Sequence, residues 1–172
     1  MLIFTGDGLI GVTPTDPAFV TIFKYWRSHP RKLGYAQATN LDGKGLSMEP
    51  EESVNVLGTQ LGLCGVDPVT GFFRDGHCNT CVQDQGSHTV CAVMTAEFLA
   101  YSKYVGNDLS TPRPEFGFQG LKAGDAWCLC ASRFLQAHDE GCAPRVNLAA
   151  THKRALQTVP LRILTQYSDQ TP

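Results

Sequence analysis

The sequence predicts an α+β domain built as a two-layer sandwich, with a small mixed or antiparallel sheet and helices on one face. Two observations support this prediction. The segment from His88 to Met94 is short, almost entirely apolar and rich in valine, which is typical of a buried strand. It runs directly into a helical pattern, and a second strand–helix pair follows residue 124. Strands and helices in this order predict a sheet with helices layered against it.

The first predicted helix follows the first strand without a linker. Thr95 provides an N-cap, Glu97 lies in the first turn where the helix dipole favours an acid, and Gly106 ends the helix. The later elements are predicted from their periodicity and from capping, glycine and proline residues. They are a strand over 126–130, a helix over 132–141, a strand over 145–150, a short helix capped by Thr151 and a last helix from Pro160.

A long segment between these two strand–helix pairs, residues 107–118, is predicted to be an ordered, proline-rich loop. It contains Pro112, Pro114 and Gly117, which prevent a regular helix or strand. Loops of this length inside a compact domain are often functional. Prolines also reduce the conformational freedom that a loop loses when it binds a ligand.

Composition limits the classes of partner and the compartment. The 172 residues carry 14 Lys and Arg against 16 Asp and Glu, for a formal net charge of −2, so neither nucleic acid nor membrane is predicted as a partner. The sequence holds no run of 18 apolar residues. Seven cysteines are an odd number and too few for a disulfide-stapled secreted scaffold. Most cysteines are therefore predicted to be thiols, and the protein is predicted to be cytoplasmic.

A change in composition near Ser53 predicts two regions. Residues 1–53 hold no cysteine and are predicted to be a weakly structured N-terminal extension. An alternative is a leader from a misassigned start codon, with translation beginning at Met48. Residues 54–172 are predicted to form a single α+β domain.

Two cysteine pairs offer soft ligands for a metal. Cys78 and Cys81 form a CxxC, and Cys128 and Cys130 form a CxC, which makes Cys78, Cys128 and Cys130 the candidate zinc ligands. Strand geometry, however, separates Cys128 from Cys130 by about 6.6 Å, a wide spacing for sulfurs about 2.3 Å from one metal. The favoured interpretation is that these two residues are small buried side chains. No cofactor is therefore predicted, and zinc is the alternative.

The second chemical hypothesis is a thiol nucleophile, with Cys78, His88 and Asp108 as the catalytic candidates and Asp75 as an alternative carboxylate. A cysteine thiol needs a neighbouring base or positive charge to react near neutral pH. Cys91 is closer to His88 in the sequence. Residues three apart in a strand point to opposite faces of the sheet, so these two cannot share a proton.

The ligand-binding candidates come from the long loop and from the turn before the first strand. They are Arg74, Asp75, Asn79, Asn107, Arg113 and Glu115. The planar guanidinium of Arg113 suits a carboxylate or a phosphate. An internal ion pair of Arg113 with Asp108 or Glu115, which only fixes the loop, explains these residues equally well.

Six segments resemble the family catalogued as domain of unknown function 2237. They read NVLG (55–58), DPVTGFFRDG (67–76), CNT (78–80), GSHTVCAVMT (86–95), GNDLSTPRPEFGF (106–118) and WCLCASR (127–133). The resemblance covers residues 54–167, about two thirds of the chain. It implies a small α+β fold and brings no assigned activity.

The cysteines divide into two groups when they are compared with this family. Cys81 and Cys142 look peculiar to this chain, which weakens a shared role for the CxxC. The cysteines that match the family pattern are Cys64, Cys78, Cys91, Cys128 and Cys130.

The predicted function is that of a ligand- or partner-binding accessory domain. In this hypothesis the 107–118 loop and the turn from Arg74 to Thr80 frame a polar pocket around His88. The sequence holds no Walker loop, GxGxxG, GxSxG or HExxH motif, which favours binding over catalysis. Two alternatives stay open: a thiol- or zinc-dependent enzyme centred on Cys78 and His88, and an oligomerising structural domain. The sequence predicts neither the ligand nor the oligomeric state.

Overall fold

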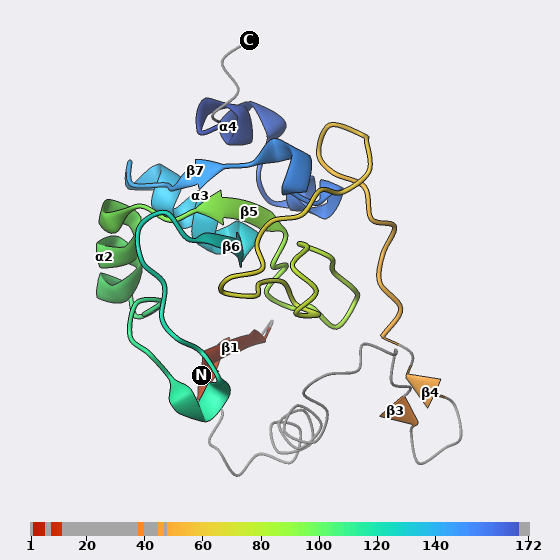
Figure 1. Ribbon diagram of the computed structural model, residues 1–172, viewed down its shortest axis with the longest axis horizontal. Coiled ribbons are helices and arrows are strands. Elements are labelled where there is room, and N and C mark those ends of the chain that lie inside the picture. Colours follow the sequence, from red (N-terminus) through yellow and green to blue (C-terminus); the bar gives the residue numbers. More distant parts are fainter. Residues whose placement is uncertain (1, 6–7, 12–37, 40–44, 47, 169–172) are drawn as a thin grey trace. The chain divides into compact units, whose positions relative to one another are not determined.

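A computed structural model describes residues 2–5, 8–11, 38–39, 45–46 and 48–168 (Figure 1). The chain divides into two units, residues 1–48 and 49–172. Within the first unit, β1 (Leu2–Thr5) pairs antiparallel with β2 (Gly8–Gly11), and β3 (Ala38–Thr39) pairs with β4 (Gly45–Leu46). Most of the predicted extension, residues 1–53, lies outside the described residues, so its weak structure stays a prediction.

The second unit contains a three-stranded antiparallel sheet among its described residues. β5 (Val90–Val93) is the middle strand, and it pairs with β6 (Ala126–Leu129) on one side and β7 (Arg145–Val146) on the other (Figure 1). In the register between β5 and β6, Val90 lies opposite Leu129 and Cys91 lies opposite Cys128. Successive residues of each strand therefore point to opposite faces of this sheet.

Helical segments follow the strands along the chain. The α-helices are α2 (Ala96–Tyr104), α3 (Ala131–Asp139) and α4 (Leu161–Gln166). The shorter 3₁₀ segments are η1 (Pro114–Phe116), η2 (Leu148–Ala150) and η3 (Lys153–Gln157). The predicted cap of the first helix is confirmed, because the Thr95 hydroxyl accepts a 3.1 Å hydrogen bond from the Phe98 amide.

The two faces of the sheet are covered differently. Val90 and Ala92 pack in the main apolar core together with Phe98 of α2 and Phe134 of α3. Cys91 belongs to a separate cluster, which contains none of the α-helix residues and is formed with Cys128 of β6, Ala150 of η2, and Cys64 and Cys78 of the coil segments. The predicted α+β fold is confirmed, with the helical layer built on the Val90 face.

Two details of the predicted C-terminal elements are wrong. The strand expected over 145–150 ends at Val146, and the chain continues into η2. His152 caps η3 in place of Thr151, since its ring accepts a 3.1 Å hydrogen bond from the Arg154 amide. The His152 ring can do this because it is buried and its Nε2 donates to the Glu52 carbonyl at 2.9 Å.

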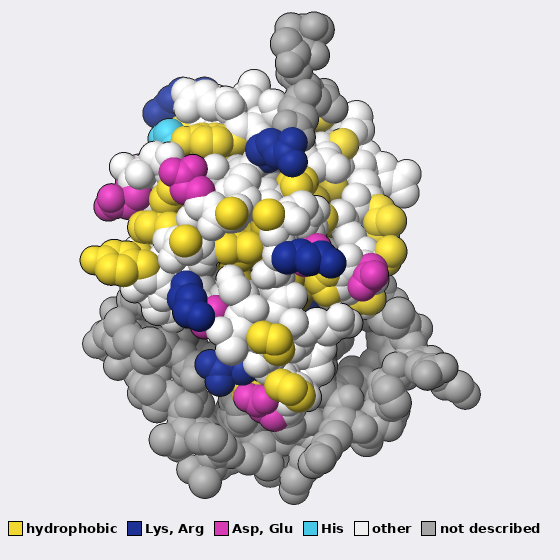
Figure 2. Space-filling model, turned by 60° about the vertical axis from the view of Figure 1, so that its left-hand side comes forward, with side chains coloured by type: hydrophobic (Ala, Val, Ile, Leu, Met, Phe, Trp, Pro, Cys, Tyr) yellow, Lys and Arg dark blue, Asp and Glu magenta, His cyan; other side chains and the backbone are white. Residues whose placement is uncertain are grey.

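The face of the second unit that Figure 2 shows has no separation of charge by sign. On the face in Figure 2, Lys and Arg side chains lie among Asp and Glu side chains and apolar ones. No helix among residues 48–168, or in the other described segments, combines the length and the apolar character needed to cross a membrane.

Candidate functional site

The candidate site is built around His88, which precedes β5, and a buried carboxylate four residues earlier. His88 Nδ1 lies 2.6 Å from Asp84 Oδ1. The second oxygen of Asp84 accepts hydrogen bonds from the His88 amide at 2.8 Å and from the Thr80 hydroxyl at 2.9 Å. The Asp84 side chain is fully buried, whereas 37% of the His88 side chain is exposed. The ring of His88 is therefore held from inside the protein and is partly exposed to solvent.

A tight turn places Asp84 and His88 together. The Asp84 amide donates to the Cys81 carbonyl, and the Ser87 amide donates to the Asp84 carbonyl, both at 3.0 Å. Ser87 adopts a left-handed conformation with φ of 46°. Gly86 is needed for close approach, because a Cβ atom there would lie 2.5 Å from Cε1 of His88. The turn thus fixes the orientation of the imidazole through its backbone.

The free thiol of Cys130 completes this site. Cys130 is half-buried, follows β6 directly and occupies the N-cap position of α3. The Ala131 amide donates to the Ser87 carbonyl at 3.0 Å, which brings the start of α3 beside the turn that carries His88. The Cys130 side chain lies close enough to the imidazole of His88 to raise the pKa of His88. Because Nδ1 of His88 faces Asp84, the ring nitrogen that remains for this thiol is Nε2.

Electrostatics favour the protonated imidazole. Burial by itself lowers the pKa of His88, but its hydrogen bond to Asp84 and its interaction with Cys130, together with the negative charges of both groups, outweigh burial and raise the pKa to about 10. Burial raises the pKa of Asp84. The hydrogen bonds and charge of His88, with the Thr80 hydroxyl, outweigh this effect and hold the Asp84 pKa below its ordinary value. Asp84 therefore acts as a fixed anion beneath His88.

Aromatic and cationic side chains lie beside the imidazole. The ring of Phe72 stacks on His88 with a centroid distance of 6.3 Å and an interplanar angle of 27°. The guanidinium of Arg74 lies 4.9 Å from the ring centroid of Trp127, and burial lowers the pKa of Arg74. Of the predicted binding residues, Arg74 follows Phe72 and Phe73 in the chain, and Asn79 directly precedes Thr80, whose hydroxyl donates to Asp84.

Disulfides occupy the sheet face opposite the helical core. All seven cysteines lie in the described part of the chain, and four of them form the pairs Cys64–Cys91 and Cys78–Cys128. The prediction that most cysteines are thiols is therefore wrong. Sequence spacing could not reveal these pairs, because β5 and β6 must first align Cys91 opposite Cys128.

The structure brings His88 into the site but not the other two predicted catalytic residues. Cys78 is fully buried and bonded to Cys128, so its sulfur is not a free thiol. Asp108 lies in the long loop, where its carboxylate accepts hydrogen bonds from the Thr111 hydroxyl and amide and pairs with Lys103 at 3.2 Å. The Thr111 hydrogen bonds hold the pKa of Asp108 well below its ordinary value.

The remaining binding candidates contact other side chains of the protein, and the Asn79 side-chain oxygen accepts a 2.7 Å hydrogen bond from the Ser53 hydroxyl. Asn79 donates to the Asp75 carboxylate at 2.7 Å, which ties together the turn ahead of β5. Asn107 donates to the Ser102 hydroxyl at 3.1 Å. Arg113 and Glu115 form an ion pair with 3.9 Å between Nη1 and Oε1, and 55% of each side chain is exposed.

The hollow beside the long loop does not include His88. Its volume is about 340 Å³, and the residues that line it are Asp67, Pro68, Ser110, Gln119, Gly120, Leu121, Lys122 and Asp125. The loop contributes Ser110 to this hollow, whereas Arg113 and Glu115 do not line it. This hollow is therefore separate from His88, and the polar pocket predicted around His88 stays a prediction.

Sequence reasoning missed the roles of Asp84 and Cys130. Cys130 was a weak zinc candidate, although its position directly before a predicted helix was a usable signal, because helix N-termini favour thiolates. The sequence gives a weaker signal for Asp84. A carboxylate four residues before a histidine contacts that histidine only when a turn brings the two side chains together. Neither residue belongs to a periodic pattern.

Comparison with known proteins gives a family but no activity. Residues 54–168, about two thirds of the chain, match a family model described as "Uncharacterized protein conserved in bacteria (DUF2237)". No curated protein matches the sequence.

Proposed function

We propose that this chain, which belongs to the domain of unknown function 2237 family, is a thiol-dependent enzyme with Cys130 as its nucleophile. The observation that carries the proposal is the series Asp84, His88 and Cys130, in which a buried carboxylate holds an imidazole whose other side faces a free thiol. One class of cysteine enzyme uses this arrangement of nucleophile, base and orienting group. The predicted thiol enzyme therefore keeps His88, with Cys130 in place of Cys78.

Each residue has a distinct role in the proposed reaction. Cys130 Sγ attacks the carbonyl carbon of an ester, thioester or amide, and its proton is held by His88. His88 then donates this proton to the leaving group, and an acyl thioester forms on Cys130. Water attacks the thioester while His88 accepts a proton, which releases the acid and restores the thiol. Asp84 is a positioning residue that keeps Nε2 of His88 directed at the sulfur.

The start of α3 supplies a donor for the developing oxyanion. The first amides of a helix have no carbonyl partner within that helix. In the described part of the chain, the Ala131 amide bonds to the Ser87 carbonyl, whereas no hydrogen bond is formed by the amide of the exposed Ser132. We assign the Ser132 amide to stabilise negative charge on the attacked carbonyl oxygen.

An activated ester tests this function directly. Incubation with p-nitrophenyl acetate is expected to release nitrophenolate and to acetylate Cys130, detected by peptide mass spectrometry. The Cys130→Ser variant should show neither signal, and the matched control Cys142→Ser, which replaces a buried free cysteine outside the site, should show both. Acetylation of other residues at the same rate as Cys130, or an unchanged signal in Cys130→Ser, would contradict the proposal.

A second candidate function is the capture of a polar ligand beside the 107–118 loop. It is supported by the hollow of about 340 Å³, in which Ser110 and Lys122 lie near two carboxylates. Because Arg113 and Glu115 lie outside it, replacing Lys122 should weaken capture of a carboxylate or phosphate ligand more than replacing Arg113. Equilibrium binding of a panel of small anions measures this difference.

The compartment is part of the proposal, since a cytoplasmic location is so far expected from the sequence alone. Disulfides such as Cys64–Cys91 persist in oxidising compartments and are rare in a reducing cytosol. In the cytosol, we therefore expect both pairs to be open. Alkylation of thiols in intact cells, followed by peptide mapping, measures the fraction of Cys64 and Cys78 that is reduced.

A further inference from the structure

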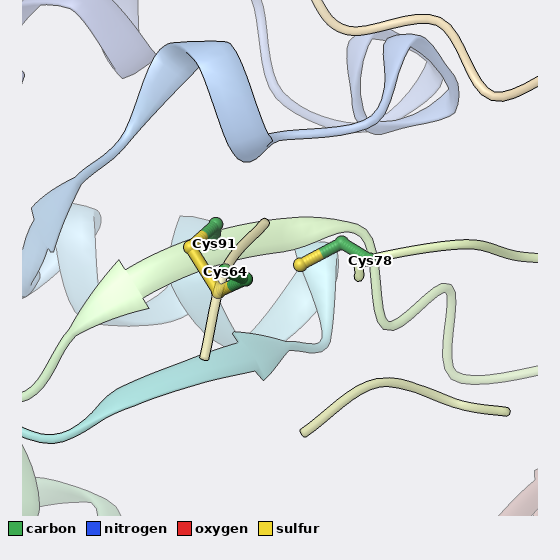
Figure 3. A group of neighbouring side chains, drawn as sticks. All are labelled: Cys64, Cys78 and Cys91. Atoms are coloured by element: carbon green, nitrogen blue, oxygen red, sulfur yellow. A yellow bond between two sulfur atoms is a disulfide. The ribbon is translucent and has the colours of Figure 1, made fainter. Parts of the chain in front are cut away.

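The sulfurs of four cysteines other than Cys130 meet on one face of the sheet. Figure 3 shows Cys64 and Cys91 joined, with the Cys78 side chain directed toward them. The Sγ atoms of Cys64, Cys78 and Cys91 all lie within 4.8 Å of one another, and Cys128 is bonded to Cys78. Among the described residues, this is the group in which three potential metal ligands approach so closely.

We propose that this four-cysteine cluster, Cys64, Cys78, Cys91 and Cys128, binds one Zn²⁺ ion as a four-thiolate site when its two disulfides are reduced. The proposed zinc site is independent of the proposed reaction at Cys130. It differs from the zinc set considered from the sequence, because Cys64 and Cys91 are ligands and Cys130 is not.

The distances suit a tetrahedral site. Four sulfurs at about 2.3 Å from one zinc lie about 3.8 Å from each other. The cluster already holds three sulfurs within 4.8 Å. Reduction lets each bonded pair separate from the usual disulfide length of about 2 Å to this spacing, a change that side-chain rotation can supply. Backbone movement is not required to bring the ligands together.

The backbone around the cluster is fixed by contacts that do not involve the sulfurs. The Cys128 amide donates to the Thr70 hydroxyl at 2.7 Å, and the Cys91 amide donates to the Thr151 hydroxyl at 3.1 Å. Cys91 and Cys128 are also paired directly in the sheet. These bonds persist when the disulfides open, so the thiols stay close together.

The four thiols of the reduced, metal-free cluster lie close together in a largely buried place. This arrangement favours the binding of one metal ion by all four sulfurs. Cys78, Cys91 and Cys128 are buried beside Ala150, and Cys64 is half-buried at the edge of the cluster. Thiolate ligands are soft and select Zn²⁺ over the hard cations Mg²⁺ and Ca²⁺. The half-buried Cys64 provides the side from which the ion enters.

The reaction balances with a dithiol reductant of the thioredoxin type. Two such dithiols transfer four electrons and four protons to the two disulfides, which yields four protein thiols and two oxidised reductants. Binding of Zn²⁺ then releases the four thiol protons. The protein therefore has an oxidised form held by two disulfides and a reduced form held by one metal ion.

Metal titration of the full chain tests this inference. The chain is reduced with a phosphine, which does not bind zinc as dithiols do, and is titrated with Zn²⁺ against a chromophoric chelator. We expect one tightly bound zinc per reduced chain and none per oxidised chain. Titration with Co²⁺ should give the visible absorption of tetrahedral cobalt with thiolate ligands. Zinc should also raise the melting temperature of the reduced wild-type chain, a measurement that needs no variant.

Matched double variants identify the ligands. Cys64→Ser with Cys91→Ser should weaken zinc binding by more than about 100-fold, since the loss of a ligand exceeds the effect of losing an outer hydrogen bond. Cys81→Ser with Cys142→Ser removes the same number of cysteines and should leave binding unchanged. Absence of zinc from the reduced wild type, or equal losses in the two double variants, would overturn the inference. Cys130 is unchanged in both double variants, and zinc binding is measured without any substrate. The result therefore tests the zinc site separately from the proposed enzyme activity.

Discussion

The turn over residues 80–88 and the loop over residues 107–118 each hold a carboxylate that accepts several hydrogen bonds and faces a basic side chain. Asp84 is buried and hydrogen-bonded to His88, and the free thiol of Cys130 lies beside the ring of His88. Asp108 is held by amides and a hydroxyl of its own loop, and its cation is the exposed Lys103. The two carboxylates differ in what lies beyond their basic partner. Beyond the partner of Asp84 lies a thiol that can act as a nucleophile, which suits a catalytic site. No such group follows the partner of Asp108 among the contacts described, so its hydrogen bonds stabilise the loop.

The largest expected difference between the two regions is in stability. Asp84→Ala should lower the free energy of unfolding by about 3 kcal/mol, because it leaves a buried hydroxyl and a charged imidazole without their acceptor. Asp108→Ala should cost about 1 kcal/mol, since its partners stay accessible to water. Urea denaturation at pH 7 measures both values. Equal losses would contradict the division into a buried site and a structural loop.

The second prediction concerns the protonation of the imidazole. Nuclear magnetic resonance of the His88 ring should show that it stays protonated up to a pKa of about 10. In Asp84→Asn the pKa should fall markedly, because the negative charge and the strongest acceptor are lost. Asp108→Asn is the control and should leave the titration of His88 unchanged. A His88 pKa near its ordinary value of about 6.5 in the wild type would contradict the electrostatic account.

A third prediction follows for the pH dependence of stability. The pKa of His88 is higher in the folded chain than in the unfolded one, so its contribution is complete below about pH 6.5 and is lost as the pH rises through about 10. The pKa of Asp84 is lower in the folded chain, so its contribution is lost as the pH falls below about 4. The stability difference between wild type and Asp84→Asn should therefore decline between pH 6.5 and 10. A difference that is constant over this range would break the link between these two groups.

The smallest expected effect is at the exposed end of the loop. Replacing both Arg113 and Glu115 by Ala should change the free energy of unfolding by less than about 0.5 kcal/mol, because their ion pair spans 3.9 Å at the surface. Thermal denaturation gives this value. A larger loss would show that this ion pair holds the loop in place, as the sequence also allowed.

More of the fold than of the site could be predicted, because the sequence patterns that indicate strands and helices involve neighbouring residues. The apolar run at β5 and the Thr95 cap of α2 each lie within a few neighbouring residues. The short 3₁₀ segment η2, by contrast, depends on tertiary contacts, so the strand expected there was too long. His88 was recognised from its residue type and position.

Other parts of the site depend on contacts between distant segments. The approach of Cys130 to His88 needs the pairing of β6 with β5 and the bond from Ala131 to Ser87. The pairing of Cys78 with Cys128 joins residues 50 positions apart. Neither contact can be recognised from the spacing of residues in the sequence. The binding hypothesis was therefore based on the charged, proline-rich loop.

The rate at which iodoacetamide alkylates Cys130 at pH 6 tests the central claim most directly. Iodoacetamide reacts with the deprotonated form of a cysteine, and a protonated imidazole beside the sulfur increases this reactivity. We expect His88→Gln to slow alkylation of Cys130 by about 100-fold, while Asp108→Asn leaves the rate unchanged. Equal rates in the wild type and His88→Gln would contradict the assignment of Cys130 as a nucleophile activated by His88.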